Sequence, residues 1–368
     1  MEKHANKYMI SGGGTGGHIY PAIAIAHAIR EKQPDAEILF VGAEGKMEMQ
    51  KVPEAGFPIE GLWISGLQRK LTWDNLSFPF KVIASLTKSS KLIRNFKPDV
   101  VIGVGGYASG PLLYKAQQKG IPTVIQEQNS YAGLTNKLLA GKAKAICVAY
   151  DQMDQFFPAK AIKWTGNPVR KDILDISDKK AKALSHFGLN ADQPVILVIG
   201  GSLGAHTINQ VLINQVETLA SARVQVLWQC GKFYYQNLRT ELAAKLAKGI
   251  HLFEFIKEMD LAYAAADVVI SRAGALSISE ISVVAKPTIF VPSPNVAEDH
   301  QTKNAMALVS KEAALMVADA KASEDLIPQV LSLVNDKVLQ EQLINNIKVF
   351  AKPNAASDIA DEILRLAK

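Results

Sequence analysis

The residues best suited to chemistry form a glycine-rich run that ends in histidine, residues 12–18, GGGTGGH. The run follows a short apolar stretch and precedes a helix-favouring stretch at 21–29 that opens with proline. Glycine lets a ligand approach the backbone closely, and the N-terminus of a following helix attracts anions. The run therefore predicts an anion site, and His18 is its candidate proton acceptor because imidazole titrates near neutrality.

Several ligands fit such a run. Gly12-x-Gly14-x-x-Gly17 matches the dinucleotide fingerprint, although the next suitable acid, Glu44, comes later than the usual spacing of about 20 residues. A P-loop is disfavoured because His18 stands where that motif needs lysine. A tight turn without a ligand is the remaining alternative, which the density of glycine makes less favourable.

A related run lies in the second half of the chain. Residues 200–206, GGSLGAH, align with 12–18 at an offset of 188 residues and also follow an apolar stretch. Alternating strand-like and helix-like stretches predict an α/β chain with two doubly wound, Rossmann-like parallel-sheet domains facing a central cleft. The predicted strands are 7–11, 37–42, 99–103, 122–126, 145–149 and 194–199, and the predicted helices include 80–95, 110–119 and 133–140.

A third stretch, residues 267–280, reads as a strand, a small-residue turn and a helix beginning near Leu276. The backbone N–H groups of Ala275 and Leu276 would face an anion there. Glu280 follows one turn later, where its carboxylate could accept both hydroxyls of a ribose. Its structural alternative is an acid that favours the start of a helix.

Charge is distributed unevenly along the chain. The net charge is +6, with +8 in residues 1–170 and −2 in residues 171–368. A basic half suits nucleic acid, an anionic membrane or a phosphorylated substrate, or it merely favours solubility. The chain shows neither a signal-peptide pattern nor an apolar run of membrane-spanning length, and its two cysteines, Cys147 and Cys230, predict reduced, buried thiols in a cytoplasmic protein.

Taken together, these motifs resemble the GT-B glycosyltransferase family. Within it they are most similar to the transferases that add N-acetylglucosamine to the lipid-linked muramyl-pentapeptide of bacterial cell-wall synthesis. The segments that carry the resemblance are 13–18, 103–111, 127–129, 132–136, 165–170, 200–205, 272–280, 299–301 and 304–305.

The resemblance implies three parts and a reaction. Residues 1–168 would form the acceptor- and membrane-facing domain, residues 169–350 the UDP-sugar domain, and residues 351–368 a helix packing back on the first domain. The implied reaction moves N-acetylglucosamine from UDP-N-acetylglucosamine to the lipid-linked acceptor with inversion at the sugar carbon. The chain has no Asp-x-Asp pair, so we expect helix N-termini rather than a metal to stabilise the leaving diphosphate, and no cofactor.

The resemblance also assigns site residues. Two candidate bases are His18 and Glu127, each with a structural alternative in which it orients its loop. The first glycine run would approach the acceptor diphosphate with its backbone. The expected donor-binding residues are Thr15, Gly16, Gly17, Asn129, Arg170, Ser202, Ile256, Ala275, Leu276, Ser277, Ile278, Ser279, Glu280 and Gln301. Ile256 would contact uracil through its backbone, Glu280 the ribose and Ser202 the diphosphate, whereas His300 competes with Gln301 for the sugar.

Residues 62–97 interleave aromatic and basic side chains, which predicts a patch that binds an anionic membrane. Many of its apolar residues could equally be core. The protein is expected at the cytoplasmic face of the plasma membrane, with other cell-wall synthesis and division proteins as further partners and without nucleic acid. The rival functions are a GT-B enzyme for another acceptor, such as a diacylglycerol or sterol, and a non-catalytic UDP-sugar-binding protein.

Overall fold

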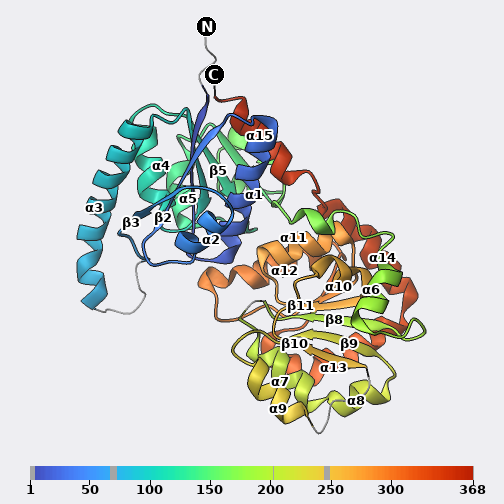
Figure 1. The fold of residues 1–368 in the computed structure, drawn as a ribbon. Helices are drawn as coiled ribbons and strands as arrows, with labels where there is room; N and C mark the ends of the chain where they lie inside the picture. Colours follow the sequence, from blue (N-terminus) through green and yellow to red (C-terminus); the bar gives the residue numbers. More distant parts are fainter. Residues whose placement is uncertain (1–4, 67–72, 202, 244–248, 368) are drawn as a thin grey trace. The chain divides into compact units, whose positions relative to one another are not determined.

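The computed structural model describes residues 5–66, 73–201, 203–243 and 249–367. The chain divides into two compact units, Met1–Val169 with Asn354–Lys368, and Arg170–Pro353. Each unit is a parallel β-sheet with helices on both faces (Figure 1). The predicted fold class of two doubly wound parallel sheets is therefore confirmed.

The first unit contains a seven-stranded sheet in the order β3-β2-β1-β4-β5-β6-β7, all parallel. The five strands expected in this half are present, and the two that were not expected, β3 and β7, are short edge strands. The strands are β1 (Lys7–Gly12), β2 (Glu37–Ala43), β3 (Ile59–Leu62), β4 (Val100–Gly105), β5 (Thr123–Glu127), β6 (Ala145–Val148) and β7 (Ile162–Trp164).

Helices cover both faces of this sheet. The helices are α1 (Gly16–Lys32), α2 (Glu48–Glu54), α3 (Trp73–Phe96), α4 (Ser109–Gln118), α5 (Leu134–Ala140) and α15 (Ala355–Leu364). Side chains of α1, α2 and α15 share one core with alternate residues of β1, β2 and β4. The end of the chain thus packs beside α1, where Lys32 Nζ lies 2.6 Å from Asp361 Oδ1.

Helix α1 begins earlier than the proline at its predicted start. Thr15 is its extended N-cap residue, and the Thr15 carbonyl accepts the N–H groups of His18 at 3.1 Å and Ile19 at 3.2 Å. Gly16, Gly17 and His18 therefore form the first helical turn. Pro21 lies inside the helix, where it has no N–H to donate to the preceding turn.

The second unit repeats the same winding with six parallel strands in the order β10-β9-β8-β11-β12-β13. The strands are β8 (Val195–Ile199), β9 (Gln225–Gln229), β10 (Ile250–Phe253), β11 (Val268–Ser271), β12 (Thr288–Phe290) and β13 (Leu315–Met316). The helices are α6 (Lys180–Phe187), α7 (His206–Asn214), α8 (Val216–Ser221), α9 (Tyr235–Leu242), α10 (Met259–Ala265), α11 (Ala275–Val284), α12 (His300–Val309), α13 (Ala322–Asn335) and α14 (Lys337–Ile347).

The core of the second unit lies between its sheet and helices α7, α8, α9 and α13. Trp228 of β9 is its largest fully buried side chain, and its Nε1–H donates to Asn209 Oδ1 of α7 at 2.9 Å. Asn209 in turn donates from Nδ2 to the Cys230 carbonyl. Both cysteines, Cys147 and Cys230, are buried thiols that form no disulfide.

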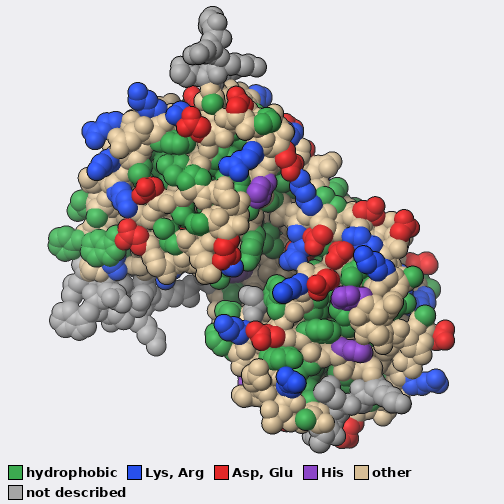
Figure 2. All heavy atoms as spheres, viewed as in Figure 1, with side chains coloured by type: hydrophobic (Ala, Val, Ile, Leu, Met, Phe, Trp, Pro, Cys, Tyr) green, Lys and Arg blue, Asp and Glu red, His purple; other side chains and the backbone are tan. Residues whose placement is uncertain are grey.

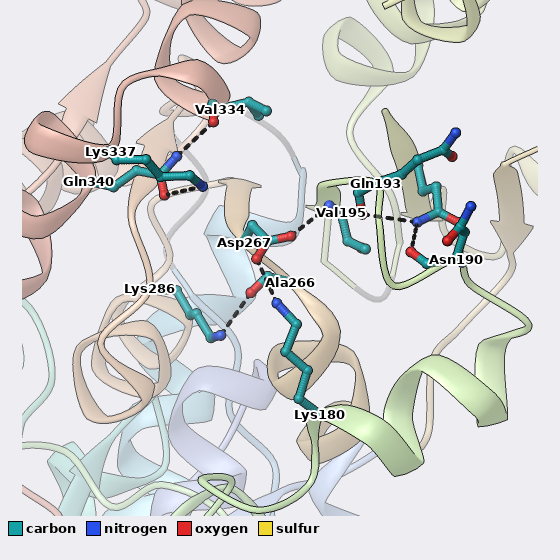
Figure 3. Close-up of polar contacts among 11 residues, drawn as sticks. Lys180, Asn190, Gln193, Val195, Ala266, Asp267, Lys286, Val334, Lys337 and Gln340 are labelled. Atoms are coloured by element: carbon teal, nitrogen blue, oxygen red, sulfur yellow. Dashed lines mark hydrogen bonds and ion pairs between the residues drawn. The ribbon is translucent and has the colours of Figure 1, made fainter. Parts of the chain in front are cut away.

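Asp267 ties together the start of two central strands (Figure 3). It precedes β11, and its carboxylate accepts the Val195 N–H and an N–H from Lys180 Nζ, each at 2.8 Å. Next to it, Lys286 Nζ donates to the Ala266 carbonyl at 2.7 Å. The pKa of Lys286 is lowered to about 8, mainly because the amine is buried. The Asp267 carboxylate opposes this shift, and the Lys180 charge adds to it.

The buried Lys286 amine should make stability depend on alkaline pH. Its folded pKa of about 8 lies below the unfolded value of 10.5, so the unfolded chain binds more protons between these values. The free energy of unfolding should then rise with pH across that window, by up to about 3 kcal/mol. Lys286→Met should remove this rise, measured as the difference in urea midpoint between pH 7.5 and 10.

The exposed Lys311→Met is the matched control for that measurement. It makes the same change of side chain within the same unit and should keep the wild-type pH dependence. An identical rise in Lys286→Met would show that other groups cause it.

Candidate functional site

His18 lies in the first turn of α1, at the carboxyl edge of the first sheet. Its Nδ1 is 3.0 Å from the Gly13 carbonyl oxygen and 3.3 Å from Thr15 Oγ1. A carbonyl only accepts, so Nδ1 carries the proton and Nε2 holds the ring lone pair. Gly105 permits this placement, because a Cβ there would lie 2.6 Å from His18 Cδ2. The arrangement presets the tautomer that a base acting through Nε2 requires.

Glu48 fills the space beneath the first glycine run and is fully buried. Its carboxylate accepts the Gly14 N–H and the Ala43 N–H, each at 3.0 Å. The expectation that this run offers bare backbone to an acceptor diphosphate must be revised at Gly14, whose amide is already bonded to a carboxylate. The amides that remain suited to an anion are those of Gly16 and Gly17 in the first turn of α1.

Glu127 ends β5 and is also buried. Its Oε1 accepts the Asn129 backbone N–H at 3.1 Å and Asn129 Nδ2 at 3.3 Å. Its Oε2 accepts the Gly133 N–H at 3.0 Å and Asn136 Nδ2 at 2.8 Å. Four donors match the number of lone-pair positions of a carboxylate. This geometry favours the loop-holding role of Glu127 over that of a base.

In the second unit, Gln229 links the second glycine run to the expected base-contact residue. Its Oε1 accepts the Ile256 N–H at 2.9 Å, while its Nε2 lies 3.4 Å from the Gly201 carbonyl. With the Ile256 N–H occupied, a uracil contact at this residue would use its carbonyl oxygen. Ser202, the expected diphosphate ligand, lies outside the described residues.

A pocket of about 380 Å³ lies beside Ile256. Aromatic rings line it from β10 and its following loop, including Phe253 and the half-exposed Phe255, and Phe187 lines it from α6. Phe187 and Phe253 pack edge to face with ring centroids 5.7 Å apart. A planar, partly apolar group is the chemistry that such walls accept.

Helix α11 presents its N-terminus at the carboxyl edge of the second sheet. Gly274 is its N-cap residue, and the first intrahelical bond runs from the Ile278 N–H to the Gly274 carbonyl at 3.0 Å. The N–H groups of Ala275, Leu276 and Ser277 precede that bond and so have no acceptor within the helix. The expected turn Ala275–Ser279 is therefore a helix N-terminus suited to an anion.

Glu280 lies in the next turn of α11 and is held at both carboxylate oxygens. Arg170 Nε donates to Oε1 at 3.0 Å, and the Tyr263 hydroxyl donates to Oε2 at 3.2 Å. Burial raises the pKa of Glu280, and the Arg170 guanidinium lowers it. Each oxygen keeps a second lone-pair position, which a ligand hydroxyl can use.

Two further side chains fix the turns around α11. Arg272 donates from one guanidinium nitrogen to the carbonyls of Val291 at 3.0 Å and Pro292 at 3.1 Å, and pairs with Asp319. Asp319 also accepts the Thr207 hydroxyl of α7 at 2.9 Å. This network connects the starts of both anion-suited helices of the second unit, α7 and α11.

The expected sugar contact Gln301 is also anchored, because its Oε1 accepts the Ser293 N–H at 2.8 Å. That bond leaves the Gln301 amide nitrogen to face a ligand. His300 opens α12 immediately before it, after Asp299 in a left-handed conformation.

The structure groups the expected residues by unit. Thr15, Gly16, Gly17 and His18 share one turn, and Glu127 with Asn129 forms a second group at the same edge of the same sheet. Sequence patterns missed the side chains that hold these groups. They are Glu48, Gln229, Tyr263, Arg272 and Asp319. Of these, Arg272 opens the 272–280 segment, but nothing in its spacing indicated Asp319 as its partner.

Comparison with known families places both halves of the chain. Residues 8–148 match the glycosyltransferase family 28 N-terminal domain, and residues 195–363 match the glycosyltransferase family 28 C-terminal domain. This chain belongs to glycosyltransferase family 28. The resemblance indicated by its motifs is thereby confirmed.

Curated members of family 28 match along the whole chain. A protein of Cytophaga hutchinsonii is 56% identical over 99% of this chain and 98% of its own length. A protein of Flavobacterium psychrophilum is 53% identical over 100% of this chain and 99% of its own length. Both carry the name UDP-N-acetylglucosamine–N-acetylmuramyl-(pentapeptide) pyrophosphoryl-undecaprenol N-acetylglucosamine transferase. The solved structure of Acinetobacter baumannii MurG is 28% identical, with a TM-score of 0.77 over 98% of this chain and 99% of its own.

The four donors around Glu127 predict a large loss of stability in Glu127→Gln. The amide would point its own N–H groups at two of those donors, at a cost of about 3 kcal/mol or more in a buried site. The measurement is the urea midpoint of unfolding. Glu54→Gln, the same change at an exposed helix position, should leave the midpoint nearly unchanged. A stable Glu127→Gln that has lost turnover would instead favour a direct catalytic role.

Proposed function

We propose that this chain transfers N-acetylglucosamine from UDP-N-acetylglucosamine to undecaprenyl-diphospho-N-acetylmuramoyl-pentapeptide, with inversion at the sugar carbon and release of UDP. The observation that carries this function is the identity above 50%, along the full chain, with transferases of that name. The local chemistry of each unit supports it as well. Donor binding is assigned to the second unit and proton removal to the first.

The donor fits the groups at the carboxyl edge of the second sheet. The uracil would bind in the pocket beside Ile256, and the ribose hydroxyls would donate to Glu280. The diphosphate would lie against the second glycine run with Ser202 and against the amides that begin α11. Gln301 and Asn129 would bind sugar hydroxyls. Arg170, already paired with Glu280, would add a positive charge near the nucleotide.

His18 is the proposed base. The acceptor hydroxyl attacks the anomeric carbon, the bond from that carbon to the diphosphate breaks, and Nε2 of His18 takes the hydroxyl proton. The Gly13 carbonyl, which accepts the Nδ1–H, would stabilise the imidazolium that forms. Thr15, Gly16 and Gly17 supply the turn that carries this ring.

The negative charge that develops on UDP needs stabilisation as the sugar leaves. The N-terminus of α11 contributes about half a positive charge together with fixed N–H donors, and such preorganised groups act like an oxyanion hole. With no Asp-x-Asp pair in the sequence, we propose turnover without a metal. Among the described residues, no three His, Cys, Asp or Glu side chains cluster as metal ligands.

The membrane-facing surface is proposed to lie on α3 and α4 of the first unit, where hydrophobic and basic side chains are intermixed (Figure 2). A groove of about 550 Å³ is lined there by Ile83, Leu86, Thr87, Ser90, Lys91, Arg94 and Lys115. Phe80 is 68% and Ile83 63% exposed, so both can enter an interface. No helix of the described residues is long and apolar enough to span a bilayer.

Parts of the expected patch behave differently. Leu62 is fully buried and belongs to the core, and Lys88 pairs with Glu44 and Glu60 at 3.5 and 3.8 Å. Arg69 and Lys70 lie outside the described residues. We therefore propose that this groove contacts the membrane, at its cytoplasmic face. Other cell-wall synthesis and division proteins are further proposed partners.

Turnover with radiolabelled UDP-N-acetylglucosamine and a short-chain lipid acceptor tests the function. We expect disaccharide-lipid product and UDP at rates unaffected by excess EDTA. His18→Ala should lower kcat by about 10²- to 10⁴-fold with little change in donor affinity, and should abolish the low-pH limb of the rate profile.

Three results would contradict parts of that proposal. Donor binding without UDP release indicates a binding protein, and product only with a diacylglycerol or sterol acceptor indicates another GT-B reaction. If kcat of His18→Ala falls by less than about tenfold, that histidine orients the loop and is not the base.

Binding to vesicles tests the membrane surface. Replacing Lys91, Arg94 and Lys115 together by Gln should largely abolish co-sedimentation with anionic vesicles, since each basic group near the surface contributes about 1 kcal/mol. Wild-type binding should also weaken as salt screens the charges. The exposed triple variant of Lys142, Lys144 and Lys160 to Gln has the same charge and should still sediment. If both variants lose vesicle binding equally, the binding depends on net charge alone and not on this groove.

A further inference from the structure

Tyr263 is a buried residue that hydrogen-bonds to the Glu280 carboxylate. It lies in α10, its side chain is 1% exposed, and its hydroxyl donates to Glu280 Oε2 at 3.2 Å. The other restraint on the same carboxylate is Arg170, whose Nε donates to Oε1 at 3.0 Å. The Arg170 side chain is 39% exposed, so the two restraints differ in rigidity.

A buried tyrosine is the more rigid of the two donors. Its ring moves about only two torsions and is packed on all sides, whereas Arg170 has a long, flexible stem with access to water. Burial raises the pKa of Tyr263 well above its usual range, and the Glu280 charge raises it further. The hydroxyl therefore stays protonated, and so remains a hydrogen-bond donor, at pH values where an ordinary tyrosine would already ionise.

We propose that Tyr263 is a positioning residue that fixes the Glu280 carboxylate in the orientation that accepts ribose hydroxyls. This inference rests on the proposed role of Glu280 in binding the donor. With Oε2 bonded to Tyr263 and Oε1 to Arg170, the plane of the carboxylate is set before a ligand arrives. Its remaining lone pairs then point in fixed directions, so that two hydroxyls can donate without a prior loss of side-chain freedom.

Removing the hydroxyl alone isolates this effect. Tyr263→Phe keeps the buried ring and leaves Arg170 as the single restraint on Glu280. Tyr150→Phe is the matched control, because Tyr150 is also buried and its hydroxyl has no hydrogen-bond partner among the described residues. It lies in the first unit, just beyond β6, and should change neither ligand binding nor turnover.

The experiment compares two ligands by calorimetry, UDP and its 2′,3′-dideoxyribose analogue, which lacks both ribose hydroxyls. Wild type should bind UDP at least about tenfold more tightly than the analogue, and Glu280→Gln should lose most of that preference. Tyr263→Phe should weaken UDP binding by about five- to twentyfold and change binding of the analogue by less than about twofold. Retained binding of the analogue also shows that the variant is folded. In turnover, the KM for the donor should rise while kcat stays within about twofold.

The outcomes separate the inference from the function on which it rests. If Tyr263→Phe weakens both ligands equally, the hydroxyl supports the fold and not the ribose contact, and the inference is wrong. If UDP affinity in Tyr263→Phe equals that of wild type, Arg170 alone orients the carboxylate, and the inference is again wrong. If wild type itself does not discriminate between the ligands, Glu280 does not bind the ribose and the donor assignment fails with it.

Discussion

Close backbone contact between glycine turns constrains the functional edge of both sheets. In the first unit, a Cβ on Gly106 would lie 2.4 Å from the Gly13 carbonyl oxygen, and a Cβ on Gly13 itself would meet the buried Glu48 side chain, 2.1 Å from Oε1. In the second unit, a Cβ on Gly231 would lie 2.1 Å from the Gly204 nitrogen. No side chain fits at such distances. Because the turns can pack this tightly, only residues 13–15 separate β1 from α1, and only residues 200–205 separate β8 from α7.

Buried carboxylates hold the loops that these turns leave at the edge. Glu48 accepts the backbone N–H groups of Gly14 and Ala43, and Glu127 accepts those of Asn129 and Gly133 together with two side-chain amide donors. Glu280 differs because its two donors are the side chains of Arg170 and Tyr263. Its free lone-pair positions make it the carboxylate of the three best suited to a ligand. Glu48 and Glu127 thus hold loops, whereas Glu280 keeps positions at which a ligand could bind.

The two units share the same winding but present different groups at the carboxyl edges of their sheets. The first glycine run ends in His18, whose Nδ1 is fixed on the Gly13 carbonyl, and a carboxylate beneath it makes its turn less suited to a diphosphate. The second unit carries no buried acid at the corresponding turn among its described residues, and α11 adds a second helix N-terminus at the same edge. Proton transfer suits the first arrangement, and binding of an anionic leaving group suits the second.

The sequence by itself determined the winding, the family and the location of the functional edges. Apolar strand-like runs, the repeated glycine runs and the 267–280 stretch depend on local composition, which a sequence displays directly. Edge strands of three or four residues escaped prediction because so short a run carries little pattern. The start of α1 was also misplaced, because proline at 21 looked like a helix start although the Thr15 carbonyl begins the helix six residues earlier.

Only the tertiary structure showed which donors surround each acid. Glu48, Glu127 and Glu280 are the same residue type in the sequence, and their environments differ because different elements bring different donors to them. The partners of Glu280 are 110 and 17 residues away in the chain, and the Arg272–Asp319 pair spans 47. Such pairings depend on the order in which the strands are wound and on which helix covers which face. Spacing along a chain records neither, and so the positioning residues became visible only in the folded protein.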